Sequence, residues 1–190
     1  MACESENPRG VPFERVEPGN QQERLTVDWI VGFTDGEGCF SIGVVRQPDR
    51  PNRRGYRTGY QVSHDFSVTQ GARSRACLDG MRNFSGVGHV YPNSRHDNHR
   101  ENLYQFSVAK RSELLNVIIP FFRRHALRTS KREDFVKFAR CLELMKMDRH
   151  RTREGLIEIL EIAQTMNRRV PRDDLIRILR GHTPDIRESE

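Results

Sequence analysis

The chain has 190 residues, which is enough for one domain of ordinary size with terminal extensions. Its 32 Lys and Arg residues outnumber its 26 Asp and Glu residues, and the net charge of +6 favours a polyanionic partner. The longest apolar run, Leu114 to Phe122, is interrupted by Asn116 and Pro120 and is shorter than the roughly 18 residues of a membrane span. A membrane-spanning protein is therefore excluded, and no membrane partner is expected.

The two ends of the chain differ in character from its middle. The first residues, MACESENPRG, contain no basic segment followed by an apolar one, so no secretory signal is expected. Residues 1–24 mix proline and glycine with charged side chains, which predicts a flexible N-terminal tail before one folded domain at 25–182 and a C-terminal tail at 183–190. We expect a soluble, intracellular protein whose widely spaced cysteines are free thiols: Cys3, Cys39, Cys77 and Cys141.

Helical and strand periodicities follow one another along the middle of the chain. Thr26 can cap a first helix, which Gly36 and Gly38 are expected to end. Apolar residues then recur at every second position, as in strands, and later at helical spacing. After the first helix, the predicted elements are strands at 39–45 and 59–70, a helix at 72–84, a strand beginning within 86–91, a strand at 102–110, and helices within 112–125, 133–147, 152–168 and 171–182.

This order is αββαββα with additional C-terminal helices, and it predicts the α+β class. Helices would cover one face of an antiparallel sheet and leave the other face open. In the strand at 59–70, apolar positions alternate with polar ones, so the open face would be polar. His64 falls on the covered face, where we expect a hydrogen-bonded core histidine, and Trp29 and Phe33 are expected to pack.

The end of the first helix carries glycines and acids together. Gly32 and Gly36 are four residues apart, a spacing that permits close approach of another helix backbone. Asp35 and Glu37 stand between glycines, where carboxylates and helix-terminal carbonyls can bind a hard divalent cation. Taken alone, such an acidic, glycine-rich turn more often only ends a helix.

The segment around these acids resembles the motif of the LAGLIDADG homing endonucleases. The similar residues are Ile30 to Gly38, IVGFTDGEG, followed by the strand CFSI. FSVTQ at 66–70, GVGHVY at 86–91 and HALRTSKREDF at 125–135 also resemble family segments, so the resemblance covers about residues 25 to 170.

The resemblance implies how the motif acts. Glu37 corresponds to the family's metal-binding acid, the carbonyl of Gly36 is a second expected ligand, and the metal is expected to be Mg²⁺, with Mn²⁺ substituting and Ca²⁺ binding without cleavage. The family's sites need two motifs, but this sequence contains one, which predicts a homodimer. The expected interface residues are Ile30, Gly32, Phe33, Asp35 and Gly36.

Further catalytic roles are carried over by position. Gln70 corresponds to a residue that orders water near the metal, although a strand-end hydrogen bond is an equally simple interpretation. Lys131 is the expected basic group near the scissile phosphate, with Arg128 as its rival because this stretch aligns ambiguously. A solvated basic helix start is the alternative for both.

The resemblance also implies a saddle-shaped sheet that faces double-stranded DNA. Alternate outward side chains would read base edges and arginines of the first hairpin loop would contact phosphates, although any one of them could simply be solvated. The candidate DNA-binding residues are Ser41, Arg46, Arg50, Arg53, Arg54, Arg57, Gln61, Ser63, Asp65, Ser67, Tyr91, Asn93 and Gln105.

The function implied is that of a site-specific homing endonuclease, intron-encoded or free-standing. It would hydrolyse both strands of a long, near-palindromic DNA site and leave 3′ overhangs. Two alternatives with the same fold stay open, namely an intron RNA maturase, with RNA as partner, and a DNA-binding regulator without cleavage. The compartment expected is a bacterial cytoplasm or an organelle matrix.

Overall fold

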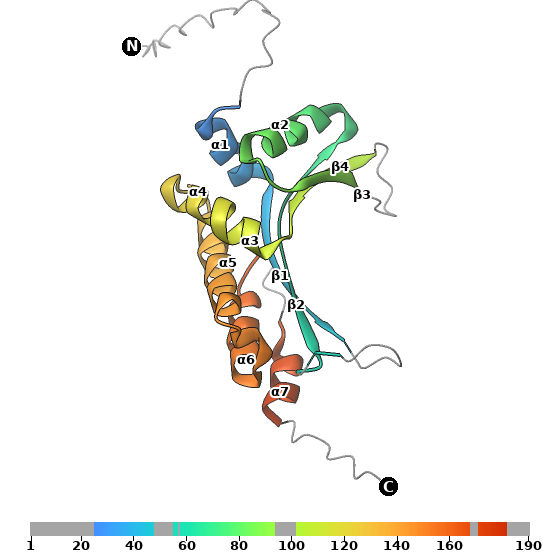
Figure 1. The fold of residues 1–190 in the computed structure, drawn as a ribbon, viewed down its shortest axis with the longest axis vertical. Coiled ribbons are helices and arrows are strands. Elements are labelled where there is room, and N and C mark those ends of the chain that lie inside the picture. The colour runs from blue at the N-terminus through green and yellow to red at the C-terminus, as the bar shows by residue number, and fades with distance from the viewer. Residues whose placement is uncertain (1–24, 48–54, 57, 94–101, 168–170, 182–190) are drawn as a thin grey trace, which may run out of the picture.

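The computed structural model describes residues 25–47, 55–56, 58–93, 102–167 and 171–181. They form one antiparallel four-stranded sheet in the order β1-β2-β4-β3, with helices packed against it (Figure 1). The elements are α1 (Val27–Glu37), β1 (Gly38–Arg46), β2 (Tyr60–Gly71), α2 (Arg75–Ser85), β3 (His89–Asn93), β4 (Leu103–Val108), α3 (Arg111–Glu113), α4 (Ile119–Arg124), α5 (Lys131–Lys146), α6 (Arg153–Ala163) and α7 (Asp173–Gly181).

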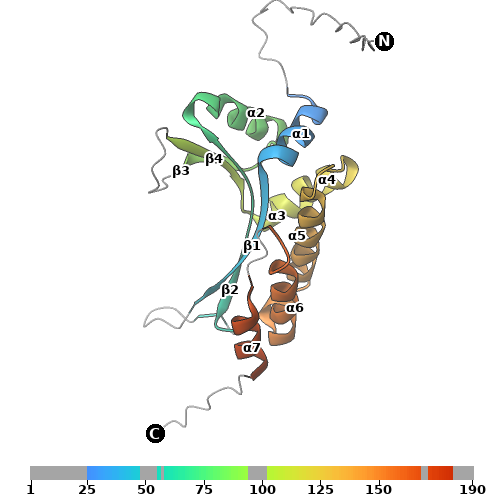
Figure 2. The same ribbon diagram turned by 180° about the vertical axis from the view of Figure 1, so that it is seen from behind.

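The α+β class and the αββαββα order are confirmed. The sheet is strongly curved, and the helices lie on its convex side, while its concave face carries none of the described helices (Figures 1 and 2). The strand registers place Phe40 opposite Phe66 and Val68 opposite Phe106, so that apolar side chains share the covered face. No helix in the described ranges is long and apolar enough to cross a membrane.

The junction of α1 and β1 has a tight local geometry. Thr26 caps α1 by accepting a hydrogen bond from the Trp29 N–H at 3.2 Å, as expected. The helix includes Gly36, contrary to expectation, and ends only at Glu37. A Cβ at Gly38 would lie 2.6 Å from Thr34 Cγ2 and 2.7 Å from the Thr34 carbonyl oxygen, so only glycine fits here. The chain can therefore pass directly from helix to strand.

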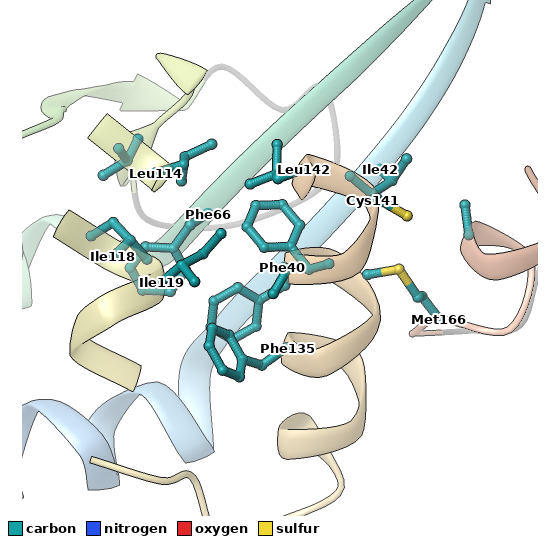
Figure 3. Packing of buried hydrophobic residues seen from close by; sticks show 14 of the residues in the cluster. Phe40, Ile42, Phe66, Leu114, Ile118, Ile119, Phe135, Cys141, Leu142 and Met166 are labelled. Atoms are coloured by element: carbon teal, nitrogen blue, oxygen red, sulfur yellow. The ribbon is translucent and has the colours of Figure 1, made fainter. Parts of the chain in front are cut away.

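The core is built around aromatic side chains on the convex side of the sheet. The rings of Phe40 and Phe66 stack at 4.9 Å, and Phe122, Phe135 and Phe138 surround Phe40 at 5.4 to 5.6 Å. Figure 3 shows Phe40 and Phe66 pointing from the strands toward the helices. Each such pair adds about 0.5–1.5 kcal/mol beyond the burial of its area. This core fixes the position of β1, and hence of the junction that precedes it.

Segments after α6 cover the free edge of β1. Asn167 Nδ2 donates to the Phe40 carbonyl and Arg172 Nη2 to the Ile42 carbonyl, each at 2.9 Å. The helix expected to reach residue 168 ends at Ala163, and Asn167 takes a positive φ of 50°. An edge strand with paired carbonyls offers less of a template for another chain.

Other expectations are corrected in detail. The helix expected at 112–125 contains a π-helical turn, Leu114–Ile118, just before Pro120, which has no N–H to donate.

The inward position of His64 is confirmed, but its two ring nitrogens are buried and find no hydrogen-bond partner among the described residues. Its burial lowers its pKa, and the charges of Arg111 and His150 lower it further.

Candidate functional site

Glu37 is the last residue of α1 and points into solvent. Its side chain is exposed, and it makes no hydrogen bond or ion pair with any residue that the structure describes. Successive carbonyls at the end of a helix also lack intrahelical donors. The end of α1 therefore offers a carboxylate that is unpaired among the described residues, next to helix-terminal carbonyls, and both kinds of oxygen are ligands that Mg²⁺ accepts.

Lys131 reaches the backbone of Gly38, the residue after Glu37, although it is far away in sequence. It is the first residue of α5, and its Nζ donates to the Gly38 carbonyl at 2.5 Å. The same ammonium charge acts on Asp35 and Cys39, on either side of Glu37. A cation is thus held one residue from the candidate metal-binding acid.

Asp35 has a different position from Glu37. Its carboxylate accepts hydrogen bonds from the backbone N–H of Arg128 at 2.8 Å and of Thr129 at 3.1 Å, and from the Thr129 hydroxyl at 2.8 Å. Burial alone would raise the pKa of Asp35, but these hydrogen bonds and the charge of Lys131 outweigh it, so the pKa is lowered. This carboxylate is used within the subunit, where it holds the turn that leads into α5.

The structure separates the two rival basic residues. Arg128 contributes its backbone N–H to Asp35, and its side chain is exposed. Lys131, by contrast, reaches the α1–β1 junction with its charged end.

Gln70 is half-buried near the end of β2, two residues beyond Val68, which pairs with Gly38. The register therefore brings Gln70 close to the same junction.

One face of α1 is bare. Gly32 and Gly36 are exposed, and no heavy atom of the described residues lies within 4 Å of a Cβ built on either, the helix's own nearby backbone aside. Phe33 is half-buried and stacks on Trp29 with ring centroids 4.5 Å apart. The expectation that Ile30 lies at an interface is wrong, because its side chain is only 4% exposed and packs in the core. On this face of the helix the accessible residues are glycines, and Ile30 is not among them.

The open face of the sheet carries short polar side chains. Ser41, Ser67 and Gln105 are half-buried there, Ser63 and Tyr91 are exposed, and Asn93 is half-buried on β3. Arg46 is exposed at the end of β1, and Gln61 accepts a hydrogen bond from Gln47 at 3.1 Å. The expected phosphate contacts of the hairpin loop lie outside the described residues: Arg50, Arg53, Arg54 and Arg57.

Asp65 occupies the middle of this open face. Its Oδ1 accepts a hydrogen bond from the Ser107 hydroxyl and its Oδ2 from Gln105 Nε2, which lies 3.5 Å away. Burial raises the pKa of Asp65, against the effect of its hydrogen bonds. The sequence interpretation missed Ser107, although Ser107 follows Gln105 by two residues and therefore shares its face.

Comparison with known proteins decides the family. Residues 30–142 match the family model described as LAGLIDADG endonuclease. The chain belongs to the LAGLIDADG endonuclease family. It is 33% identical over 145 residues to the "Probable intron-encoded endonuclease 2" of Neurospora crassa, an alignment that covers 75% of this chain and 29% of that protein. The chain spans between 25% and 33% of the length of the curated relatives that it matches.

Two solved structures of homing endonucleases are similar to this LAGLIDADG chain. The structure of I-TnaI is 42% identical with a TM-score of 0.69, and the match covers 82% of this chain and 97% of that one. The structure of I-SmaMI bound to cleaved DNA is 26% identical with a TM-score of 0.71, and the match covers 84% of this chain but 50% of that one. This LAGLIDADG chain therefore corresponds to nearly all of one structure and to half of the other.

Proposed function

We propose that two copies of this chain form a metal-dependent homing endonuclease, which hydrolyses both strands of a long, near-palindromic DNA site and leaves 3′ overhangs. The observation that carries this proposal is the exposed carboxylate of Glu37, unpaired among the described residues, at the end of a glycine-faced helix, with the Lys131 ammonium held on the carbonyl of the next residue, Gly38. A carboxylate that is neither paired nor packed is available to a ligand.

The case for two copies rests on counting acids. No group of three or more His, Cys, Asp or Glu side chains that could hold a metal occurs among the described residues. At the end of α1 each subunit offers one carboxylate unpaired among the described residues, that of Glu37, and a two-fold axis beside α1 would bring a second Glu37 to face the first. The match to half of the I-SmaMI chain supports this inference, because one copy of the matched domain accounts for only half of that structure.

In this dimer, Glu37 and the Gly36 carbonyl of each subunit would hold the metal. Mg²⁺ would lower the pKa of a water molecule and neutralise charge at the phosphate when bound. Mn²⁺ is expected to substitute, and Ca²⁺ to support DNA binding without cleavage. A structure of I-SmaMI with an uncleaved DNA target in the presence of calcium ions supports the last expectation by analogy.

Other side chains at the junction have separate roles in the proposal. The Lys131 ammonium would stabilise negative charge at the scissile phosphate, and the contact with the Gly38 carbonyl positions it. Gln70 would orient water through its amide, which can donate and accept at once. Arg128 would contribute its backbone N–H to the hydrogen bond with Asp35. Its side chain would be available to contact a DNA phosphate.

The concave face of the sheet is the proposed DNA surface. It carries the polar side chains, is free of the described helices, and belongs to a chain of net charge +6. Side chains of this face would read base edges in the major groove. The solved relatives I-SmaMI and I-LtrWI are bound to DNA, which supports DNA as the partner by analogy. The two-fold symmetry of the protein predicts the near-palindrome of the site.

The substitution Glu37→Gln tests the proposal, because it keeps the size of the side chain and removes its charge. Cleavage of a library of partly palindromic duplexes with Mg²⁺ is expected to fall by at least about a hundredfold, the scale of losing a strong electrostatic contribution. Binding in Ca²⁺, dimerisation and thermal stability should persist. Glu154→Gln, on the exposed surface of α6, is the matched control and should cleave as wild type does.

Full activity in Glu37→Gln would contradict the assignment of the catalytic acid. Binding of DNA by the wild-type protein without Mg²⁺-dependent cuts would instead identify a regulator. Failure to bind any duplex, combined with binding to structured intron RNA, would identify a maturase.

A further inference from the structure

On the open face of the sheet, a hydrogen-bonded network joins three strands. Asp65 of β2 accepts from Gln105 and Ser107, both of β4. The backbone carbonyl of Asp65 also accepts from the Ser41 hydroxyl of β1 at 3.4 Å. The Asp65 side chain is thus used by neighbours within the sheet, and Gln105 is the longest side chain among its partners on this face.

The chemistry of the pair fixes which way the Gln105 amide points. An ionised carboxylate can only accept hydrogen bonds, so the amide must turn its nitrogen, and not its oxygen, toward Asp65. A glutamine amide has two N–H groups and one carbonyl oxygen. With one N–H committed to Asp65, one N–H and the oxygen Oε1 are left for an outside ligand.

We propose that Asp65 is a positioning residue that orients the Gln105 amide so that Gln105 prefers adenine at one position of each half-site. This inference rests on the proposed function, since it assumes that the open face meets the DNA major groove. Adenine presents an acceptor at N7 and a donor at N6, which match the remaining N–H and Oε1 of the amide. Gln105 itself would contact the base.

The other bases match this arrangement less well. Guanine presents two acceptors, N7 and O6, and would need both N–H groups of the amide, one of which Asp65 holds. Cytosine offers only a donor and thymine only an acceptor at this edge, so each would use half of the amide. By holding one N–H of the Gln105 amide, Asp65 therefore disfavours guanine in particular. The negative charge of Asp65 also disfavours a direct contact between its carboxylate and a DNA phosphate.

The test measures base preference and does not depend on cleavage. The full-length chain is incubated in Ca²⁺ with duplexes of randomised sequence, and the bound duplexes are sequenced. Gln105→Ala identifies the symmetry-related base pairs that Gln105 reads, because only their preference should disappear. Asp65→Ala is expected to lower the preference for adenine over guanine at the same base pairs by about tenfold.

Two further variants separate positioning from general damage to the fold. Asp65→Asn keeps an acceptor oxygen near Gln105 and is expected to restore most of the preference. Asp174→Ala removes the same charge from α7, where the side chain is 87% exposed, and should leave the preference at these base pairs unchanged.

The proposal is overturned if Asp65→Ala leaves the preference intact, if it alters base pairs other than those altered by Gln105→Ala, or if wild type prefers another base there. If wild type selects no sequence at all, the proposed function has failed, and the unmodified protein alone reveals it.

Discussion

At the scale of single residues, two acids of one motif have opposite surroundings. Asp35 is held by three hydrogen bonds from Arg128 and Thr129, whereas Glu37 has no partner among the described residues. The motif alone identified Glu37 as the candidate ligand. The partners of Asp35 could not be predicted, because they lie 93 and 94 positions away and depend on the packing of α5.

Replacement of Asp35 by alanine should destabilise the fold without removing the candidate metal ligand. We expect the free energy of unfolding to fall by about 1–2 kcal/mol, the scale of hydrogen bonds to a charged group after solvent exposure is allowed for. The pKa of Asp35 is lowered in the fold, so its ionised carboxylate stabilises the folded state fully at pH values above 3.8, the ordinary pKa of this group. This stabilisation is lost as the pH falls below that value. Urea denaturation at fixed protein concentration measures both effects.

Asp174→Ala is the matched control for this prediction, because its ion pair with Arg177 is highly exposed and worth little. Equal stability of Asp35→Ala and Asp174→Ala would show that the hydrogen bonds to Arg128 and Thr129 contribute nothing.

His64 predicts a dependence of stability on pH. Burial lowers its pKa, as do Arg111 and His150, so the folded state favours the neutral ring. The contribution of the neutral His64 ring to stability is therefore complete at pH values above 6.5, the ordinary pKa of histidine. It is lost as the pH falls from there toward the lower pKa of the folded state. The melting temperature should decrease between about pH 7.5 and pH 5.5. His64→Leu should weaken this decrease, and an unchanged slope would exclude His64 as its source.

At the scale of elements, periodicity predicted the strands well and the helix ends less well. Alternating residues such as Phe66 and Ser67 fix both the strand and the face of each side chain. The end of α6 at Ala163 was not predictable in this way, because it depends on hydrogen bonds from Asn167 and Arg172 to β1. Contacts between segments distant in sequence produce no periodic pattern in the sequence from which they could be predicted.

The bare face of α1 predicts that a bulky side chain there affects assembly more than folding. Space is open around a Cβ at Gly32, so Gly32→Leu should leave the subunit folded. In the proposed dimer, the same side chain would separate the two helices. We expect the dissociation constant of the dimer to rise by at least about tenfold, equivalent to a clash of about 1.4 kcal/mol. Sedimentation at several concentrations measures it.

Gly181→Leu is the control for Gly32→Leu, since a Cβ at Gly181 also meets open space but lies at the end of α7. A dimer that tolerates both substitutions equally would place the subunit interface elsewhere.

At the scale of the whole molecule, one sheet separates two tasks. Its convex face is covered by helices and holds the core, while its concave face carries none of the described helices (Figure 2) and presents polar side chains. The alternation of polar and apolar residues along the strands predicted this division. The network of Asp65, Ser107 and Gln105 could not be predicted from that alternation, because the network depends on the register between β2 and β4. Register between strands is set by turns and packing together, and parity alone does not determine it.

The proposed dimer, with one Glu37 in each subunit, makes a last prediction about cooperation between subunits. If both Glu37 side chains of a dimer are needed, a dimer with one Glu37→Gln subunit should not cut both strands. After wild-type and Glu37→Gln subunits are mixed in equal amounts and allowed to exchange, about one quarter of the dimers should be fully active. Double-strand cleavage should then decrease to that fraction. A decrease to only one half would mean that each subunit carries a complete site, whereas nicked products from the mixed dimers would mean that each acid serves one strand.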